Sequence, residues 1–406
     1  MLRSSWGAAV AHVARVVGDL GLAEDAVQEA CAVAVERWPR DGVPADPRAW
    51  LVGTARHKAI DRLRRESRRA GKEEAAARWT GTIPAPPDDP APLDPAGLDD
   101  EELGLVFGCC HPALAPEVRV ALALRSVCGL TTAEVAARLL VAEPAMAKRL
   151  TRARAKLRDA AVPLRLPGPD DLPDRLPSVL RVLYLVFTEG HHASSGDALV
   201  RPELCDDAIR LTRSLVRRLP GEPEAGGLLA LLLLTDARRA ARTDAAGDVV
   251  LLEDQDRRLW DRDEIAEGDA VLERALRANR PGSYQLQAAI ASCHADAGSA
   301  ADTDWRQIAL LYGELVRYEP TPVVEANRAV AVAMSEGPAA GLVILDAVAL
   351  HPRLAGWVPV HLARADLLAR LDRTADAVAA YEHALTLGPS APERRLIARR
   401  LGELRG

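Results

Sequence analysis

The segment that most constrains the fold is residues 130–157, which predicts two short helices joined by a tight turn. Thr131 or Thr132 can cap the first helix, and Glu134 lies in its opening turn, where the helix dipole favours a negative charge. Pro144 suits the first turn of the second helix. A single buried stripe along that helix is predicted by four apolar residues at helical spacing, which are Met146, Leu150, Ala153 and Leu157.

The second of these helices also carries a strong positive charge. Between Lys148 and Arg158 there are six basic residues and no acidic one. A helix with one face packed and the other cationic is suited to docking in the DNA major groove. Taken alone, the segment also fits an ordinary solvated basic helix.

A second basic segment lies nearer the N-terminus. Residues 53–72 hold eight Lys or Arg residues against two acids, Asp61 and Glu66, although the whole chain has a formal net charge of −6. The net charge alone argues against nucleic-acid binding. Two basic islands in an acidic protein are nevertheless consistent with DNA contact confined to those islands.

Composition favours an all-α protein of two to four domains. The chain has 406 residues and 49% hydrophobic residues, but only 3% are aromatic, and the apolar content is mostly Ala, Leu and Val. The six cysteines are scattered, and the adjacent pair Cys109 and Cys110 lacks the spacing of common zinc sites, so we expect reduced thiols, no metal and no cofactor. No export or membrane-spanning segment is recognisable, which predicts a cytoplasmic protein.

The chain divides into four predicted blocks. Residues 1–70 are predicted to form a helical block with a loop from Pro39 to Pro47. Near the end of this loop, Asp46 is placed to cap a long helix. Residues 71–98 are predicted to be a linker, because residues 84–95 contain six prolines and three aspartates. Residues 99–161 contain the helix-turn-helix, and residues 172–406 are predicted to be helical throughout.

The fourth block contains degenerate internal repeats. An anchor residue, a large residue four positions later and an apolar residue seven positions later recur at 33- to 40-residue intervals, in some cases followed by proline. The anchors are Gly268, Ile308, Gly341 and Ala377, and three of the four are small. This pattern is typical of the second helix of tetratricopeptide repeats, whose period is about 34 residues. Generic helical hairpins are the alternative interpretation.

With these motifs in view, residues 1 to about 161 resemble the sigma-70-like extracytoplasmic-function sigma factors of bacteria. The likeness is carried in region 2 by residues 23–30, 38–39, 47–51 and 55–65, and in region 4 by residues 109–114, 130–136, 146–150 and 152–153. A subgroup with a C-terminal tetratricopeptide-like extension is indicated by the cysteine pair and by residues 184–191, 260–261, 284–290, 304–305, 327–333 and 361–366.

This resemblance implies an alternative sigma factor that binds core RNA polymerase and recognises the −10 and −35 promoter elements, and not an enzyme. The residues that match polymerase-binding positions are Asp25, Gln28 and Glu29. Those that match −10 contacts are Arg56, Lys58, Arg62, Arg64 and Arg65. Those placed for the −35 element are Lys148, Arg149, Arg152 and Arg154. The C-terminal domain is expected to regulate the factor or to bind a protein or peptide partner.

The main alternative is a one-component helix-turn-helix regulator with a repeat-based sensor domain. Such a protein binds duplex DNA without polymerase, usually as a dimer on two half-sites. The region 2 block argues against this alternative, because a simple repressor has no use for a polymerase-docking helix or for a strand-opening helix.

Overall fold

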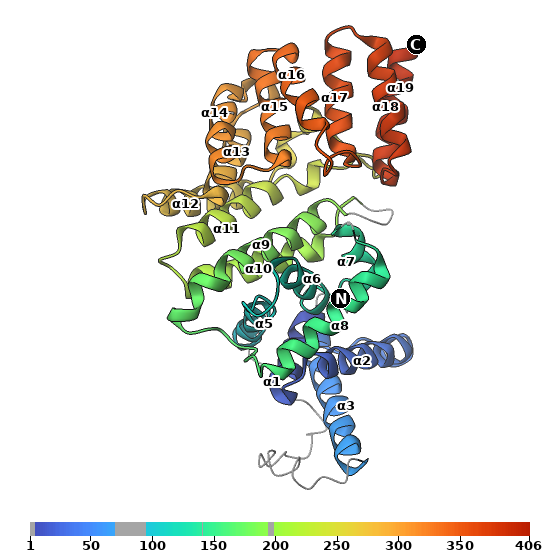
Figure 1. Ribbon diagram of the computed structural model, residues 1–406, viewed down its shortest axis with the longest axis vertical. Helices are drawn as coiled ribbons and strands as arrows, with labels where there is room; N and C mark the ends of the chain where they lie inside the picture. The colour runs from blue at the N-terminus through green and yellow to red at the C-terminus, as the bar shows by residue number, and fades with distance from the viewer. Residues whose placement is uncertain (1–4, 70–94, 140, 194–198) are drawn as a thin grey trace. The chain divides into compact units, whose positions relative to one another are not determined.

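The protein is all-α, as its composition predicted. The computed structural model describes residues 5–69, 95–139, 141–193 and 199–406, and regular structure within them is helical apart from one isolated bridge between Thr243 and Val249 (Figure 1). The chain forms two compact units, the first comprising Met1–Phe187 and Asp206–Ser214, and the second Thr188–Cys205 and Leu215–Gly406.

The first unit contains the region 2 and region 4 helices. They are α1 (Trp6–Val17), α2 (Leu20–Asp41), α3 (Pro47–Arg69), α5 (Pro95–Cys109), α6 (Pro116–Ser126), α7 (Thr132–Arg138) and α8 (Glu143–Asp159), followed by the short η2 (Pro169–Asp171). Most of α9 (Leu172–His191) and the middle of α10 (Pro202–Arg218) complete this unit.

Local sequence signals explain where the first helices begin and end. Gly18 ends α1 with a left-handed φ of 71°, and the Asp19 side chain then caps α2 by accepting a hydrogen bond from Leu22 N at 2.9 Å. Asp46 caps α3 as predicted, by accepting from Ala49 N at 2.9 Å.

Two predicted boundaries were wrong. The loop was expected to begin at Pro39, but α2 continues to Asp41, and Gly42 N donates to Trp38 O at 3.1 Å. Because proline has no N–H, Pro39 leaves one hydrogen bond of this last turn unmade. The predicted linker lies outside the described residues from 71 to 94, and its end is already helical, because α5 begins at Pro95, a favoured first position.

Close helix packing holds the first unit together. α1 packs against both α3 and α5. A Cβ atom on Gly7 would lie 2.2 Å from Glu102 Oε1 and 2.5 Å from Val127 O, so only glycine allows this approach. Phe107 of α5 is completely buried.

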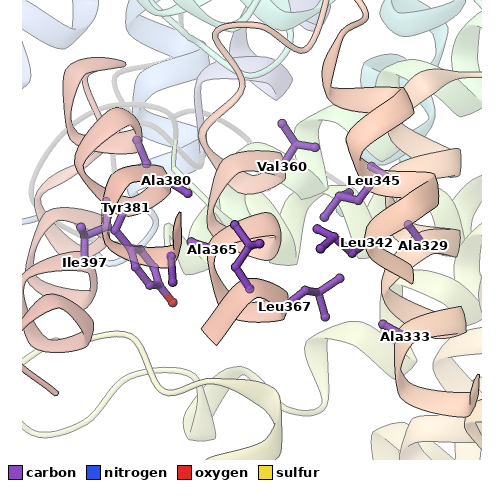
Figure 2. Close-up of a cluster of buried hydrophobic side chains, with 14 of the residues drawn as sticks. Ala329, Ala333, Leu342, Leu345, Val360, Ala365, Leu367, Ala380, Tyr381 and Ile397 are labelled. Atoms are coloured by element: carbon purple, nitrogen blue, oxygen red, sulfur yellow. The ribbon is translucent and has the colours of Figure 1, made fainter. Parts of the chain in front are cut away.

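The second unit is a succession of packed helices. They are α11 (Pro223–Asp236), α12 (Arg262–Leu276), α13 (Ser283–Asp296), α14 (Trp305–Tyr318), α15 (Pro322–Glu336), α16 (Pro338–Ala349), α17 (Val358–Arg370), α18 (Thr374–Thr386) and α19 (Ala391–Arg405). Short 3-10 turns are η3 (Arg239–Ala241), η4 (Leu252–Asp254), η5 (Arg257–Leu259) and η6 (Ala300–Asp302). Helices that follow one another pack together, and Figure 2 shows the apolar cluster that α15 to α19 share.

The anchors of the predicted repeats are packing positions. A Cβ atom on Gly341 would lie 2.4 Å from Ala329 O, which explains a small residue there, and Ala377 is fully buried. Tyr381, four positions after Ala377, is 4% exposed within the cluster of Figure 2. The repeat pattern therefore identified core residues correctly, while its assignment to tetratricopeptide repeats stays a prediction.

The compact units divide the chain differently from the predicted block boundary at residue 172. Most of α9 belongs to the first unit, where Arg119 Nη1 donates to Ser178 Oγ at 3.0 Å. Residues 206–214 belong there too, and Arg210 binds carboxylates at the start of α5. The beginning of the predicted C-terminal domain is thus part of the unit that holds regions 2 and 4.

Candidate nucleic-acid interface

The helix-turn-helix forms as its sequence predicted. Thr131 Oγ1 accepts from Glu134 N at 3.1 Å, and Glu134 Oε2 accepts from Thr131 N at 2.7 Å, so the two residues form a reciprocal capping box at the start of α7. This arrangement assigns the cap to Thr131. α8 begins at Glu143, with Pro144 in its first turn.

α8 has one buried face and one cationic face. The predicted stripe is confirmed: Met146 and Leu150 are 1% exposed, and Ala153 and Leu157 are also buried. Lys148, Arg149 and Arg152 are exposed. These three side chains are therefore held on a rigid helix and are available to a ligand, as groove docking requires.

Arg154 differs from the other three predicted −35 residues. Its Nη2 lies 2.5 Å from Oε2 of Glu24, a residue of α2 that is only 4% exposed. Ser126 Oγ donates to the other oxygen of Glu24 at 2.5 Å, and Trp6 Nε1 donates to Ser126 O at 3.0 Å. Arg154 thus joins region 4 to region 2 in this structure, and its side chain is not presented with those of Lys148 and Arg152.

The predicted −10 residues lie along α3. Arg64 and Arg65 are exposed, whereas Arg56, Lys58 and Arg62 are half-buried. All five residues follow one helix, which gives the cationic surface a fixed direction.

The predicted polymerase-binding residues lie on the neighbouring helix α2. Asp25, Gln28 and Glu29 are exposed there. Arg62 Nη1 lies 3.1 Å from Asp25 Oδ2, and Lys58 Nζ lies 3.5 Å from Glu29 Oε2. The structure therefore brings the two predicted sets together. Such exposed ion pairs contribute about 0–1 kcal/mol each, so phosphate or a partner protein can replace them at little cost.

A carboxylate cluster in the first unit was not predicted from the sequence. Arg210 Nη1 lies 2.6 Å from Asp99 Oδ1, and its Nη2 lies 2.9 Å from both Glu102 Oε2 and Asp207 Oδ1. Arg48 of α3 approaches Asp99 at 3.4 Å. The cluster joins region 2, region 4 and α10. No local motif signals it, because its members are far apart in the chain; Arg210 and Asp99, for example, are separated by 111 positions.

Three carboxyl groups share two guanidinium groups in this cluster, so one acid is favoured in its neutral form. Burial and the nearby charge of Glu102 raise the pKa of Asp207 to about 7, and these effects outweigh the ion pair with Arg210. A folded-state pKa above the ordinary value means that the folded protein binds this proton more tightly than the unfolded chain does.

We expect Asp207 to make the first unit less stable as pH rises from about 4 to about 7, after which this contribution levels off. The Asp207→Asn variant keeps an acceptor for Arg210 and removes the titration, so its stability advantage over the parent chain should grow across that pH range. Thermal unfolding between pH 5 and 8.5 measures the difference. Asp206→Asn, at the exposed neighbouring position, is the control; an equal advantage for both variants would refute the assignment.

The cysteine pair of α5 has a packing role. Cys109 and Cys110 are buried free thiols, and burial raises the pKa of Cys110 to about 12, which disfavours the reactive thiolate. His111 Nδ1 accepts from Ala113 N at 3.1 Å. In the part of the chain that the structure describes, no group of three potential metal-ligating side chains is found, and no helix is long and apolar enough to cross a membrane.

Three parts of the chain match known family models. Residues 4–69 match the model of sigma-70 region 2, and residues 105–157 match that of sigma-70 region 4. Residues 175–276 match a family of unknown function (DUF6596). The third match covers part of both structural units and assigns no activity to the C-terminal half.

Individual proteins similar to this chain extend the comparison. An uncharacterized protein of Rhizobium meliloti is 45% identical over 98% of this chain and 93% of its own length. The ECF RNA polymerase sigma factor SigK of Mycobacterium ulcerans is 32% identical over 38% of this chain and 75% of its own length. The probable ECF RNA polymerase sigma factor SigI of Mycobacterium tuberculosis is 28% identical over 48% of this chain and 62% of its own length. No solved structure matches the chain.

Proposed function

The chain belongs to the extracytoplasmic-function family of RNA polymerase sigma factors, and we propose that it binds core RNA polymerase in the cytoplasm and directs initiation at promoters with −10 and −35 elements. The observation that carries this proposal is the two-faced helix α8, whose buried stripe fixes it in a helix-turn-helix while three cations stay exposed. Lys148, Arg149 and Arg152 would contact the −35 element. Arginine can bind guanine through two hydrogen bonds, and each such contact discriminates by about 1–3 kcal/mol.

The α3 surface supports a −10 role. Arg64 and Arg65 are exposed, and the partners of Lys58 and Arg62 are weakly held carboxylates of α2. Together with Arg56, these residues would follow the phosphates of the DNA, where each neutralised phosphate releases counterions and makes binding sensitive to salt. Binding should therefore weaken steeply as salt concentration rises.

The polymerase-binding role of α2 can be tested by charge reversal. We expect Asp25→Lys combined with Glu29→Lys to weaken binding to core polymerase about tenfold or more, because both acids are exposed and would become repulsive to a basic docking surface. Quantitative pull-down with bacterial core polymerase gives the affinity. Glu36→Lys, at another exposed position of α2, should bind normally. An unchanged affinity of the double variant would remove these residues from the interface.

We further propose that the C-terminal extension regulates access to these surfaces. α10 contributes Arg210 to the carboxylate cluster beside Arg48 of region 2, and Arg154 of α8 is engaged by Glu24 of region 2. Contacts of this kind restrain regions 2 and 4 in one arrangement, whereas separate −10 and −35 elements require each region to follow its own DNA segment. Release of the two contacts would make the factor competent for promoter binding.

A further inference from the structure

The second unit contains a cavity of about 540 Å³. Its walls come from η4, η5 and η6 and from α13, α14, α15, α17, α18 and α19. The apolar lining includes Leu252, Trp305, Val330, Met334, Leu362 and Tyr381. Tyr381 belongs both to the lining and to the cluster of Figure 2, so the cavity borders the packed core of α15 to α19. Its size and lining are typical of small-molecule sites.

One wall carries a buried cation without a counter-ion. Arg257 is 8% exposed, and its Nη1 donates to His294 O at 2.5 Å and to Ala297 O at 2.6 Å. Its Nη2 donates to Thr303 Oγ1 at a long 3.4 Å. Among the described residues no carboxylate forms an ion pair with Arg257. Burial and the charge of Arg262 lower the pKa of Arg257, and the nearby charge of Asp302 opposes this effect without pairing with the guanidinium. A buried charge that is solvated only by neutral groups is costly, and an anion beside it would be stabilised.

His294 provides a second polar group beside Arg257. Its ring stacks edge-on against Trp305, with the centroids 5.2 Å apart, and its Nδ1 is buried without a hydrogen-bond partner within the described ranges. Burial, together with the charges of Arg238 and Arg257, lowers the pKa of His294 to about 4, so the imidazole is neutral at physiological pH. Because the His294 ring is neutral, Arg257 is the charged group of this pair, and its positive charge favours an anionic ligand.

A carboxylate of the chain itself already lies on the wall of this cavity. Glu253 of η4 extends its carboxylate to Arg370 at 3.3 Å and to Arg400 at 4.0 Å, and the preceding residue, Leu252, lines the cavity. Counting Asp366 with Glu253, the lining has three arginines and two acids, a net charge of +1. A ligand with an aliphatic chain and a carboxylate would therefore match this lining, because its chain suits the apolar side chains and its negative charge suits the net positive charge.

We infer that this cavity is the binding site for a small organic acid, whose carboxylate would be the missing counter-ion of Arg257 and whose apolar body would contact Trp305, Met334 and Leu362. No part of this inference depends on promoter binding, so it can succeed or fail independently of the sigma-factor role. A ligand bound there would contact both η4 and α17, so its binding could change the packing of the C-terminal unit.

Calorimetric titration of the full chain with octanoate, octanol and octylamine tests the ligand class. Octanoate should bind at least about tenfold more tightly than octanol, because its carboxylate can accept charge-assisted hydrogen bonds from Arg257, and octylamine should not bind. Equal affinity for octanoate and octanol would overturn the role of Arg257. Absence of octanoate binding would overturn the site.

Variants locate the binding. Ala363→Trp places a ring in the cavity and should abolish octanoate binding, and Arg257→Gln, which removes the proposed partner of the carboxylate, should weaken it. Arg258→Gln is the matched control, because Arg258 lies in the same short turn, η5, and pairs with Asp256 outside the lining. If the tryptophan variant does not fold, the comparison of the two arginine variants decides; equal affinities for them would contradict the site. An acetylated peptide with the sequence of residues 249–254 that bound more tightly than octanoate would identify a protein segment as the occupant and refute a small-molecule site.

Discussion

Charge reversal of Arg149 and Arg152 to glutamate should reduce −35-dependent transcription by at least about 100-fold while leaving the affinity for core polymerase unchanged. Each arginine–base contact discriminates by about 1–3 kcal/mol, and glutamate adds repulsion from phosphate. Both side chains are exposed on α8, whose buried stripe does not include them, so the fold should tolerate the change. In vitro transcription and polymerase pull-down on the same preparations give the two readouts.

The control carries the same change in net charge. Arg277, at the end of α12, and Arg317 of α14 are exposed in the second unit, and their reversal to glutamate should leave transcription close to that of the parent chain. If the Arg149 and Arg152 variant lost polymerase binding and transcription equally, the assignment of α8 to the −35 element would be wrong.

The Arg154→Met variant should increase transcription several-fold and lower the stability of the first unit. Removing Arg154 leaves the carboxylate of Glu24, which is 4% exposed, with Ser126 as its remaining hydrogen-bonding side chain. Breaking a buried ion pair in this way costs about 3 kcal/mol. This cost destabilises the arrangement in which α8 packs against α2, because the ion pair is made there. Opening of that arrangement would release region 4 for DNA.

The same variant distinguishes the two roles considered for Arg154. If Arg154 reads the −35 element, as its position in the basic run first suggested, transcription would fall. The double variant Glu24→Gln with Arg154→Met removes both charges and should recover much of the lost stability in thermal unfolding. Lys156→Met, at an exposed position of the same helix, controls for the loss of a cation.

Sequence reasoning predicted the features that depend on neighbours in the chain. The Asp46 cap and a threonine cap at position 131 or 132 were predicted, because each cap uses residues within one helical turn of the other, and the structure then assigns the second cap to Thr131. The buried stripe of α8 was also predicted from the sequence, because helical periodicity alone separates Met146 from its exposed neighbours.

The features that the sequence did not reveal depend on pairing across long separations. Nothing in the basic run distinguishes Arg154 from Arg152, because the difference is made by Glu24, which comes from another helix. The carboxylate cluster around Arg210 is of the same kind, with Glu102 108 positions away. The cavity of the second unit likewise requires side chains from six helices and three short turns to meet.

The most direct test of sigma-factor activity is to mix the purified full chain with bacterial core RNA polymerase and genomic DNA fragments, and to score complex formation and new transcript starts. We expect a stable complex and starts that share −35 and −10 sequences, and we expect these starts to disappear with the Arg149 and Arg152 variant. Binding to duplex DNA without any binding to polymerase would rule out a sigma factor and would favour a one-component helix-turn-helix regulator.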